Sequence, residues 1–594
     1  MTSCEDYLEA DNKSAGGNSM ESYFGQESNL GGYRDYAYML LKPLVNGGYI
    51  EMMENGTDIY WHGNNKKNST FDKYTITVGD KTVEGFYSKC YLMINAANGL
   101  LEFGSTYASD AKFLRAYGYY LLTQQFGKVP YVKRFINDSS RDYPRESLQT
   151  IYDSCLADLD EVIADGNLAE SSQDGYVNKR AARALAAKIA LAAGWDLETT
   201  LNNAEAGTYT VGGNTYFTRA AQYAEQAVEG MQMYDSFADK WSVANERSNQ
   251  ETIFALTYDR SAASNIGDEA EGGHSLANYY GRYYGSGPNI CGVKYVDGSF
   301  CKSLKSLYLW EAGDERYDAT FQNTIYGYQD GVWPSTGYYA YLNNSEETLA
   351  TMGLWYYYSD ESKMTSEEFK ALVDTMAASG KFAQGDNKLP AHAIYLGTEC
   401  EIYDFNAAGT SYNTTSQDYA TTIEATAGGQ DPVRKWDDGN ALMSQTSQNS
   451  YRWIPLFHMT ETMLTAAEAY YMAGNESKAL EIVNQIRTRA KATTLTSFAD
   501  YAPQYATDLY PSFEIRGIDV ILDEKARETY AEQNRWTDLR RTKQLFRYKT
   551  TFVQDGVSLE IVDNYGNYKW YRPIPSTELS SNMSMSEADQ NPGY

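Results

Sequence analysis

Residues 460–490 read TETMLTAAEAYYMAGNESKALEIVNQIRTRA, and this stretch decides the fold. Apolar residues and alanines recur at three- and four-residue spacing on both sides of the Gly474-Asn475 pair. That period predicts one helix over 460–472 and a second over 477–490, joined by a tight turn. Four small side chains would let the two helices pack closely: Ala467, Ala469, Ala479 and Ala490.

Helical hairpins of this kind recur along the chain. A hairpin of about 30 residues is similar to a tetratricopeptide unit, whose repeat is about 34 residues long. The segments 178–195 and 217–232 form a second pair. Further helical periods cover 33–45, 86–103, 111–126 and 148–164, and a last long one covers 521–546. We therefore predict a mainly α fold in which about four such pairs form a scaffold.

The amino-acid composition changes between residues 261 and 450. Gly, Asn, Ser, Thr and Tyr are dense there, and helical periodicity is weak apart from 366–378. This composition predicts a loop-rich lobe with short strands on the helical frame, and binding residues concentrate in loops on rigid scaffolds. The predicted organisation is a polar tether (1–30), a helical part (31–260), a variable ligand-binding region (261–450) and a second helical part (451–594).

The composition excludes some classes of function. The 594 residues carry a formal net charge of −29, and such an acidic surface would repel nucleic acid. No run of 18 or more apolar residues occurs, so we predict no membrane-spanning segment. Tyr occurs 54 times against 20 for Phe, and this excess suggests aromatic rings that face water or ligands.

Signatures of common catalytic centres are absent from the sequence. The four histidines are scattered, and no HExxH, GxSxG or GxxxxGK[ST] motif occurs. We therefore predict a protein that is not an enzyme. A pair of carboxylates acting on a glycan stays open as an alternative, because such a pair is defined by its separation in space.

Several motifs follow one another in an order that identifies a family. They are FLRAY at 113–117 with QFGKVP at 125–130, AARALAAKIALAAGW at 181–195, NQETIF at 249–254, EAY at 468–470 with NQIRTRA at 484–490, DEKARETYAEQNRWTDLR at 523–540, YRPIP at 571–575 and QNPGY at 590–594. By this order and spacing the chain resembles the SusD/RagB family over essentially its whole length. It departs from the family pattern at Gln533-Asn534, where Gly is common.

The resemblance implies a role at the cell surface. It implies a SusD-like fold and a lipid anchor at Cys4, which follows the small residue Ser3, on the extracellular face of the outer membrane. It also implies capture of an oligosaccharide or polysaccharide, delivered by a lid-like motion to a SusC-type TonB-dependent transporter. Binding of a peptide or another nutrient in the same role is the alternative. No cofactor is expected.

The resemblance also implies a shallow ligand site built from two stretches, one between the first two helices. A sugar ring stacks its apolar face on an aromatic ring while polar neighbours bind its hydroxyls. In the first stretch we predict ligand contacts from Asp58, Tyr60 and Trp61, with Trp61 as the stacking platform. The alternative is that Trp61 fills the helix junction beneath.

The second stretch lies in the loop-rich middle, where aromatic residues gather beside glycines. Its candidates, of which about half are expected in the core, are Tyr279, Tyr280, Tyr283, Tyr284, Trp333, Tyr338, Tyr339, Trp355 and Tyr356. Five other tryptophans are predicted to be core residues: Trp195, Trp241, Trp310, Trp453 and Trp570.

Two further predictions concern charged residues. In the motif at 523–540, we expect Arg535, Trp536 and Asp538 to fix the last helix by an ion pair and ring packing, without contact to ligand. The acidic loop from Asp431 to Asp438 could hold a structural Ca²⁺, although it lacks the spacing of an EF-hand. A solvated loop is the alternative.

Overall fold

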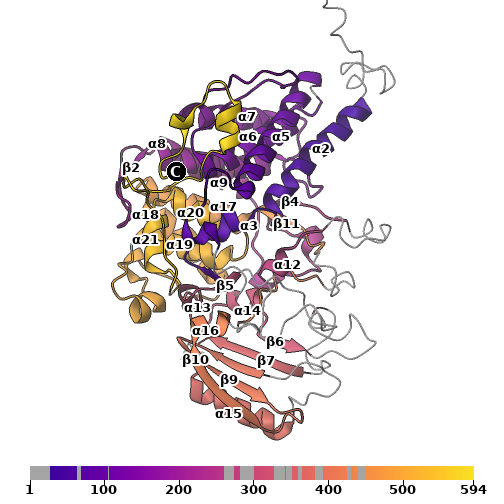
Figure 1. Ribbon diagram of the computed structural model, residues 1–594. Helices are drawn as coiled ribbons and strands as arrows, with labels where there is room; N and C mark the ends of the chain where they lie inside the picture. Colours follow the sequence, from indigo (N-terminus) through magenta and orange to yellow (C-terminus); the bar gives the residue numbers. More distant parts are fainter. Residues whose placement is uncertain are drawn as a thin grey trace, which may run out of the picture.

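The computed structural model describes most of the chain and shows a helical lobe joined to a sheet lobe (Figure 1). The described residues are 27–62, 69–104, 106–259, 273–280, 300–326, 342, 351–358, 364–380, 392–424, 430–438, 450–554 and 556–594. None of the helices among them is long and apolar enough to cross a membrane.

The hairpin predicted from residues 460–490 is present. Helix α17 spans Met459–Met472 and α18 spans Glu476–Arg489, and the two helices pack together. The turn between them needs Gly474, whose φ is +83°, in the left-handed region that glycine enters without a Cβ clash. The Asn475 side chain then caps α18 by accepting a hydrogen bond from the Lys478 amide at 3.2 Å.

The remaining scaffold helices stack in chain order. Helices α5 (Lys81–Phe103), α6 (Ala108–Phe126), α7 (Leu148–Ala164), α8 (Lys179–Leu197) and α9 (Thr215–Val228) each pack on the next, and α9 packs on α17. The predicted pairing of 178–195 with 217–232 is therefore confirmed. The packing is close, because a Cβ on Gly194 of α8 would lie 2.7 Å from the Phe217 ring of α9. Helix α2 (Glu27–Val45) packs on α5 and begins earlier than the predicted helix at Tyr33.

The single helix predicted over 521–546 is wrong. Three helices replace it: α19 (Gly517–Glu528), α20 (Arg535–Arg541) and α21 (Leu545–Thr551). Ala531, Gln533 and Lys543 interrupt the run with φ of +65°, +62° and +59°, and a left-handed residue cannot continue a right-handed helix. Tertiary bonds hold the break, since the Ala531 amide donates to the Tyr60 hydroxyl and the Gln533 amide to the Glu54 carboxyl.

The middle of the chain is more regular than its composition suggests. A five-stranded sheet has the order β10-β9-β8-β7-β6, with β7 and β8 parallel and the other pairs antiparallel. Its strands are β6 (Thr324–Tyr326), β7 (Thr351–Tyr358), β8 (His392–Leu396), β9 (Glu399–Phe405) and β10 (Tyr412–Asp418). Helix α15 (Ser366–Ser379) covers one face and buries Phe369 against Tyr395 and Tyr403.

The remaining elements are short, and several of them lie between the two lobes. They are α3 (Ile50–Glu54), β1 (Tyr60–His62), α4 (Thr70–Lys73), β2 (Thr199–Asn203), β3 (Thr208–Val211), α10 (Phe237–Trp241), β4 (Thr252–Leu256), α12 (Leu276–Tyr279), β5 (Phe300–Lys302), α13 (Leu304–Leu307), α14 (Arg316–Thr320), α16 (Tyr419–Glu424), β11 (Ile454–His458) and α22 (Ser576–Ser581). One buried hydrophobic cluster runs through the helical lobe and reaches the sheet, where it includes Ile394, Leu396 and Ile402. The alternate residues of β8 and β9 form a separate small cluster with α15.

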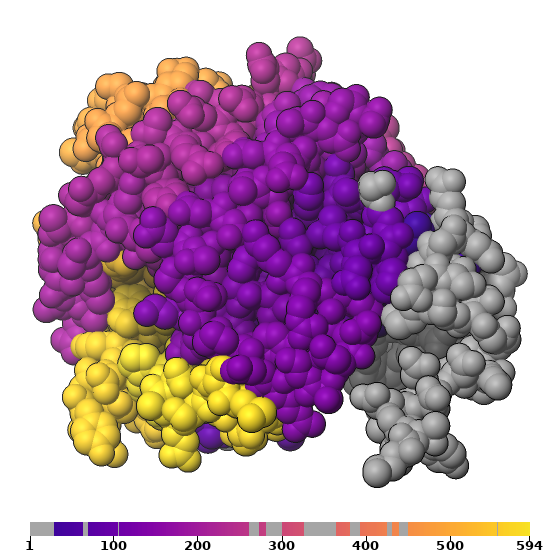
Figure 2. All heavy atoms as spheres, turned by 90° about the horizontal axis from the view of Figure 1, so that it is seen from above, coloured from indigo at the N-terminus to yellow at the C-terminus, as the bar shows by residue number. Residues whose placement is uncertain are grey.

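The C-terminal tail lies against the N-terminal helices (Figure 2). The Asn591 side chain donates to the Phe126 carbonyl at 2.9 Å and to the Arg572 carbonyl at 2.8 Å, and Arg145 donates to Asn591 at 2.8 Å. Gly127 ends α6 with φ of +70°. The motifs at 125–130, 571–575 and 590–594 therefore meet in space, where they close the fold.

Candidate ligand-binding site

A short antiparallel pair joins the two stretches from which a ligand site was predicted. Strand β1 pairs with β5 in the register Tyr60 with Lys302, Trp61 with Cys301 and His62 with Phe300. The end of the first stretch and the start of β5 in the loop-rich middle are thus side by side, although they are far apart in sequence.

The residues of the first stretch face the core. Asp58, Tyr60 and Trp61 are 0%, 3% and 4% exposed. The Trp61 indole donates to the Phe552 carbonyl at 3.0 Å, and the Tyr60 ring packs against Tyr530 with centroids 5.1 Å apart. The prediction that these residues contact a ligand is wrong, because they are buried and no ring face is open. The alternative, in which Trp61 fills the helix junction, agrees with the structure.

Asp58 is the centre of a buried ion-pair cluster. It accepts from Arg535 at 2.6 Å and from Lys305 at 2.6 Å, and Lys305 also binds Asp523 at 3.0 Å. Burial alone would raise the pKa of Asp58, but Arg535 and Lys305 hold that pKa well below its usual range. The predicted structural role of Arg535 is therefore confirmed, as is that of Trp536, which is fully buried.

The candidate residues of the second stretch fall into three groups: some lie in the core, some lie on a strand, and some lie outside the described residues. Tyr280 is buried, and its hydroxyl donates to Glu54 at 3.0 Å; Tyr279 is half-buried against the core. Trp355 and Tyr356 belong to β7, opposite Ala393 and Ile394 of β8, so the loop position expected for them is wrong. Six candidates lie outside the described residues: Cys4, Tyr283, Tyr284, Trp333, Tyr338 and Tyr339.

The structure brings Tyr60 and Tyr280 together as core partners, with ring centroids 5.7 Å apart. Of the tryptophans predicted to be core residues, Trp195, Trp241 and Trp310 are buried, whereas Trp453 and Trp570 are half-buried.

A shallow hollow on the surface is lined by polar groups and by part of a buried tryptophan. It lies between α10, α14 and the 430–438 loop, and its lining includes Trp241, Ser242, Gln322, Leu342, Arg434 and Arg452. The Trp241 ring packs edge-on against Trp436 at 5.3 Å, and its indole N–H has no hydrogen-bond partner among the described residues. Arg452 is fixed by donation to the Trp241 carbonyl at 2.8 Å.

This hollow lies beside the predicted second stretch. The Val433 amide donates to the Tyr280 carbonyl at 3.0 Å, and the Arg434 amide donates to the Thr320 carbonyl at 2.8 Å. An indole edge, guanidinium groups, an amide and a hydroxyl together suit the hydroxyls of a sugar. Sequence reasoning did not find this site. It predicted Trp241 as a core residue, which agrees with its burial, and it treated Arg434 as part of an acidic loop; no local motif marks the hollow.

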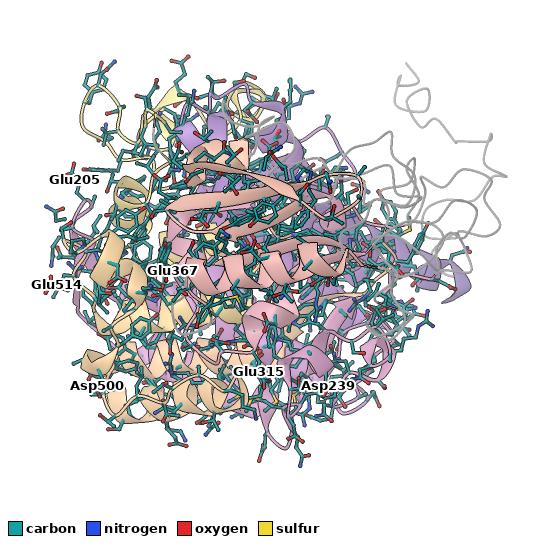
Figure 3. The ribbon with its side chains drawn as sticks, turned by 90° about the horizontal axis from the view of Figure 1, so that it is seen from below. Glu205, Asp239, Glu315, Glu367, Asp500 and Glu514 are labelled. Atoms are coloured by element: carbon teal, nitrogen blue, oxygen red, sulfur yellow. The ribbon has the colours of Figure 1, made fainter. Side chains whose placement is uncertain are left out.

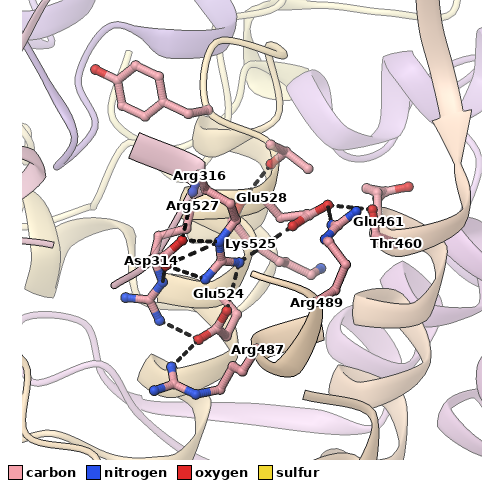
Figure 4. Close-up of polar contacts among 12 residues, drawn as sticks. Asp314, Arg316, Thr460, Glu461, Arg487, Arg489, Glu524, Lys525, Arg527 and Glu528 are labelled. Atoms are coloured by element: carbon pink, nitrogen blue, oxygen red, sulfur yellow. Dashed lines mark hydrogen bonds and ion pairs between the residues drawn. The ribbon is translucent and has the colours of Figure 1, made fainter. Parts of the chain in front are cut away.

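The family motif at 523–540 forms a buried network of charges (Figure 4). Glu524 accepts from Arg316 at 3.0 Å, from Arg487 and from Arg527. Glu528 accepts from Lys240 at 3.1 Å and from Arg489 at 2.5 Å. Burial alone would raise the pKa of Glu524, but the three arginines outweigh it and keep that pKa low. The network joins α19 to α10, α14 and α18 and has no open face for a ligand.

The carboxylates of the acidic loop 431–438 also accept hydrogen bonds from other residues of the protein. Asp431 accepts from Lys302 and, at 2.6 Å, from the Tyr317 hydroxyl, and Asp438 accepts from the Tyr451 amide at 2.8 Å. These carboxylates are buried, so the solvated-loop alternative is wrong for them. Within the described ranges, no group of His, Cys, Asp and Glu could hold a metal ion.

The exposed carboxylates are spread over both lobes. Figure 3 labels six of them: Glu205, Asp239, Glu315, Glu367, Asp500 and Glu514. Glu367 belongs to α15 of the sheet lobe, whereas the others come from separate turns and helices. This distribution favours a general contribution of the acidic charge to solubility.

Comparison with known proteins shows the family. Residues 250–594, more than half of the chain, match the model of the SusD family. Residues 42–191 match a second model, described as starch-binding and associating with the outer membrane. The chain belongs to the SusD family.

Individual relatives agree with this assignment. The starch-binding protein SusD of Bacteroides thetaiotaomicron is 23% identical over 82% of this chain and 72% of its own length. The SusD-like protein P2 of Formosa agariphila is 22% identical over 97% of this chain and 90% of its own. Among solved structures, NanU of Bacteroides fragilis has a TM-score of 0.62 at 16% identity, over 97% of this chain and 99% of its own. A laminarin-binding SusD-like protein has a TM-score of 0.57 at 18% identity, over 96% and 100%. The structural likeness concerns the fold.

Proposed function

We propose that this protein binds a glycan at the bacterial cell surface and delivers it, as a lid, to a SusC-type TonB-dependent transporter. The proposal is carried by membership of the SusD family together with the second match, described as starch-binding and associating with the outer membrane. Relatives named for binding starch and laminarin support a polysaccharide or oligosaccharide as the ligand.

The hollow beside Trp241 supports the proposal at the level of residues. Its lining includes the buried Trp241, the guanidinium groups of Arg434 and Arg452 and the Gln322 amide, next to the start of the predicted second stretch. Tyr283, Tyr284, Trp333, Tyr338 and Tyr339 remain predicted stacking partners for the same ligand. Trp355 and Tyr356 of β7 also remain predicted candidates.

Binding without hydrolysis is the second part of the proposal. A glycosidase needs two carboxyl groups about 5–9.5 Å apart on either side of the scissile bond. No Asp or Glu lines the hollow among its described residues. The hollow therefore suits retention of a sugar better than cleavage.

The first test is affinity electrophoresis of the purified chain through gels that contain different polysaccharides. We expect one class of polymer to retard the protein and to remain intact when its length is checked afterwards. Arg434→Ala should reduce the retardation, because it removes a guanidinium from the hollow. Arg247→Ala is the matched control, since Arg247 is exposed, lies outside the hollow and faces Trp453.

The results separate the possible functions. Retardation that is lost in Arg434→Ala and kept in Arg247→Ala would support glycan binding at the hollow. Breakdown of the polymer would replace binding by hydrolysis. No retardation by any polymer, with binding to peptides instead, would contradict the glycan proposal and favour another nutrient.

The membrane and transporter parts need their own experiments. With the native signal sequence, Cys4→Ser should release the protein from the membrane fraction when the transporter is absent. Retention of that variant on the membrane would contradict acylation of Cys4. Co-purification of the tagged wild-type protein with a SusC-type barrel from a glycan-grown native strain would support the lid role.

A further inference from the structure

A second polar pocket lies inside the helical lobe, away from the hollow. Helices α2, α6, α8 and α17, strand β11 and the turn before α20 enclose it. Its polar lining includes Tyr117, Tyr120, Lys188, Glu461, Asn534 and Thr537. A smaller void continues from it past the same Lys188 and Glu461 towards α20.

An ion pair stands at the centre of this pocket. Lys188 of α8 lies 3.0 Å from Glu461 of α17, with side chains that are only 12% and 10% exposed. Glu461 as a whole residue is 7% exposed, and its second carboxylate oxygen has no hydrogen-bond partner among the described residues. Such a buried oxygen costs free energy unless water or a ligand binds it. The pair is therefore incomplete without a donor in the pocket.

The neighbouring polar groups are also available. The side chains of Asn534 and Thr537 and the hydroxyls of Tyr117 and Tyr120 make no hydrogen bond to any described residue. Thr537 is half-buried in α20, and Asn534 caps that helix without a side-chain bond. Glu532, by contrast, is occupied by His458 at 2.9 Å and Lys435 at 3.0 Å. The pocket thus offers free donors and acceptors beside two tyrosine rings.

This set of groups defines the chemistry of a ligand. A carboxylate and an ammonium 3.0 Å apart can share two adjacent hydroxyls, each of which donates to Glu461 or accepts from Lys188. Asn534 and Thr537 would bind further hydroxyls, and the tyrosine rings would cover the apolar face of a pyranose. Because one cation faces one free carboxylate oxygen, a neutral ligand fits better than a charged one.

We propose that this pocket binds one neutral hexopyranose, either as a free sugar or as the terminal residue of a short chain. Enclosure by six elements excludes the interior of a polymer. The inference extends the proposed function, since a glycan-capturing protein would meet such sugars. The residues that line this pocket differ from those that line the hollow, where the polymer is proposed to bind.

The test uses glucose, galactose and mannose as probes, each alone, with saturation-transfer NMR and calorimetry on the whole chain. We expect at least one hexose to bind the wild type with a dissociation constant of about 1 mM or tighter. Glu461→Gln and Thr537→Val should each weaken that binding at least tenfold. Glu481→Gln is the matched control, because Glu481 forms an exposed pair with Lys478 at 3.0 Å on α18.

The outcomes are decisive for the pocket. Absence of binding by all three hexoses, or equal binding by wild type and Thr537→Val, would overturn the proposal. Thr537→Val keeps the side-chain shape, so it decides the matter even where Glu461→Gln melts early. Disaccharides of the bound hexose then distinguish a free sugar from the terminal residue of a chain. If the pocket accepts a chain end, a disaccharide should compete with the hexose for binding.

The same variants keep this inference apart from the proposed function. Arg434→Ala should lose polymer retardation and keep hexose binding, and Thr537→Val should do the reverse. Loss of both activities in Thr537→Val would mean that the two sites are one and would overturn a separate pocket. Hexose binding without any polymer retardation would contradict the proposed function and leave the pocket in place.

Discussion

The junction around α19 and the core of the sheet lobe are held together by opposite means. At the junction, Glu524 and Glu528 are fully buried and are bound by cations from α10, α14 and α18. In the sheet lobe, α15 places Phe369 and Val373 against the rings of β8 and β9. The first arrangement fixes the identity of each partner, whereas the second needs only apolar volume.

This difference explains which part of the chain carries family motifs. A buried carboxylate without its cation costs several kcal/mol, so each member of the junction depends on several others far away in sequence. Apolar residues of similar size replace one another at small cost. The junction motifs therefore identify the fold, while the core of the sheet lobe tolerates more change in sequence.

The largest expected effect comes from Glu524→Gln, which alters the buried charge network of the junction. The variant keeps the side-chain shape but removes the negative charge that faces Arg316, Arg487 and Arg527. We expect the free energy of unfolding to fall by about 3–5 kcal/mol, because buried cations are left without a counter-charge. Chemical denaturation of the whole chain measures this loss.

Its control is Glu481→Gln, in which an exposed ion pair with Lys478 is lost. Exposed pairs contribute about 0–1 kcal/mol, so the control should unfold like the wild type. Equal losses in both variants would show that the buried network has no special role.

Phe369→Ala should have a smaller and more local effect. The Phe369 ring is fully buried in the separate cluster of the sheet lobe, and removing such a ring costs about 3 kcal/mol. We expect faster hydrogen exchange in α15, β8 and β9, with unchanged exchange in α17 and α18. Faster exchange in α17 as well would mean that the two cores unfold as one unit.

The sequence was sufficient for the scaffold because helical period and small residues are local signals. It was not sufficient at Ala531 and Gln533, where contacts to Tyr60 and Glu54 hold a left-handed backbone that no local preference favours. It also failed for β7, since GLWYYY was assigned to a loop although its tyrosines favour a strand. The departure from the family pattern at Gln533 falls on one of these left-handed positions.

The candidate site shows the same limit. Trp61 has polar neighbours in sequence, and so it resembled an exposed ring; only the pairing of β1 with β5 and the Phe552 carbonyl place it in the core. The hollow beside Trp241 draws on segments that are distant in the chain. Sequence patterns indicate which residue types are present, but they do not show which distant segments share a surface.

Trp61→Phe tests the corrected role of this residue. The substitution keeps an aromatic ring but leaves the Phe552 carbonyl without the indole donor and shrinks the buried volume. We expect a loss of about 1–3 kcal/mol in the free energy of unfolding, with unchanged retardation by the polysaccharide that binds the wild type. Weaker retardation with unchanged stability would restore the role of a stacking platform.

Glu54→Gln should change the stability least. Glu54 and Glu524 are both buried glutamates, but they have different hydrogen-bond partners. Unlike Glu524, Glu54 accepts from neutral groups, the Tyr280 hydroxyl at 3.0 Å and the Gln533 amide at 2.7 Å. Burial raises the pKa of Glu54 from 4.5 to about 8, so the folded protein keeps this proton while the unfolded chain loses it. Wild-type stability should therefore fall as pH rises from about 4.5 to 8 and level off above that range.

Glutamine cannot ionise, so the variant should lack this one contribution to the pH dependence. Between pH 6 and pH 7 the wild type should lose about 1 kcal/mol more than Glu54→Gln, since one bound proton changes stability by about 1.4 kcal/mol per pH unit. Denaturation curves of both proteins at these two pH values measure the difference, and all other titrating groups cancel. Parallel losses would show that Glu54 is ionised in the folded protein and that burial without a directly bonded cation does not suffice to keep it neutral.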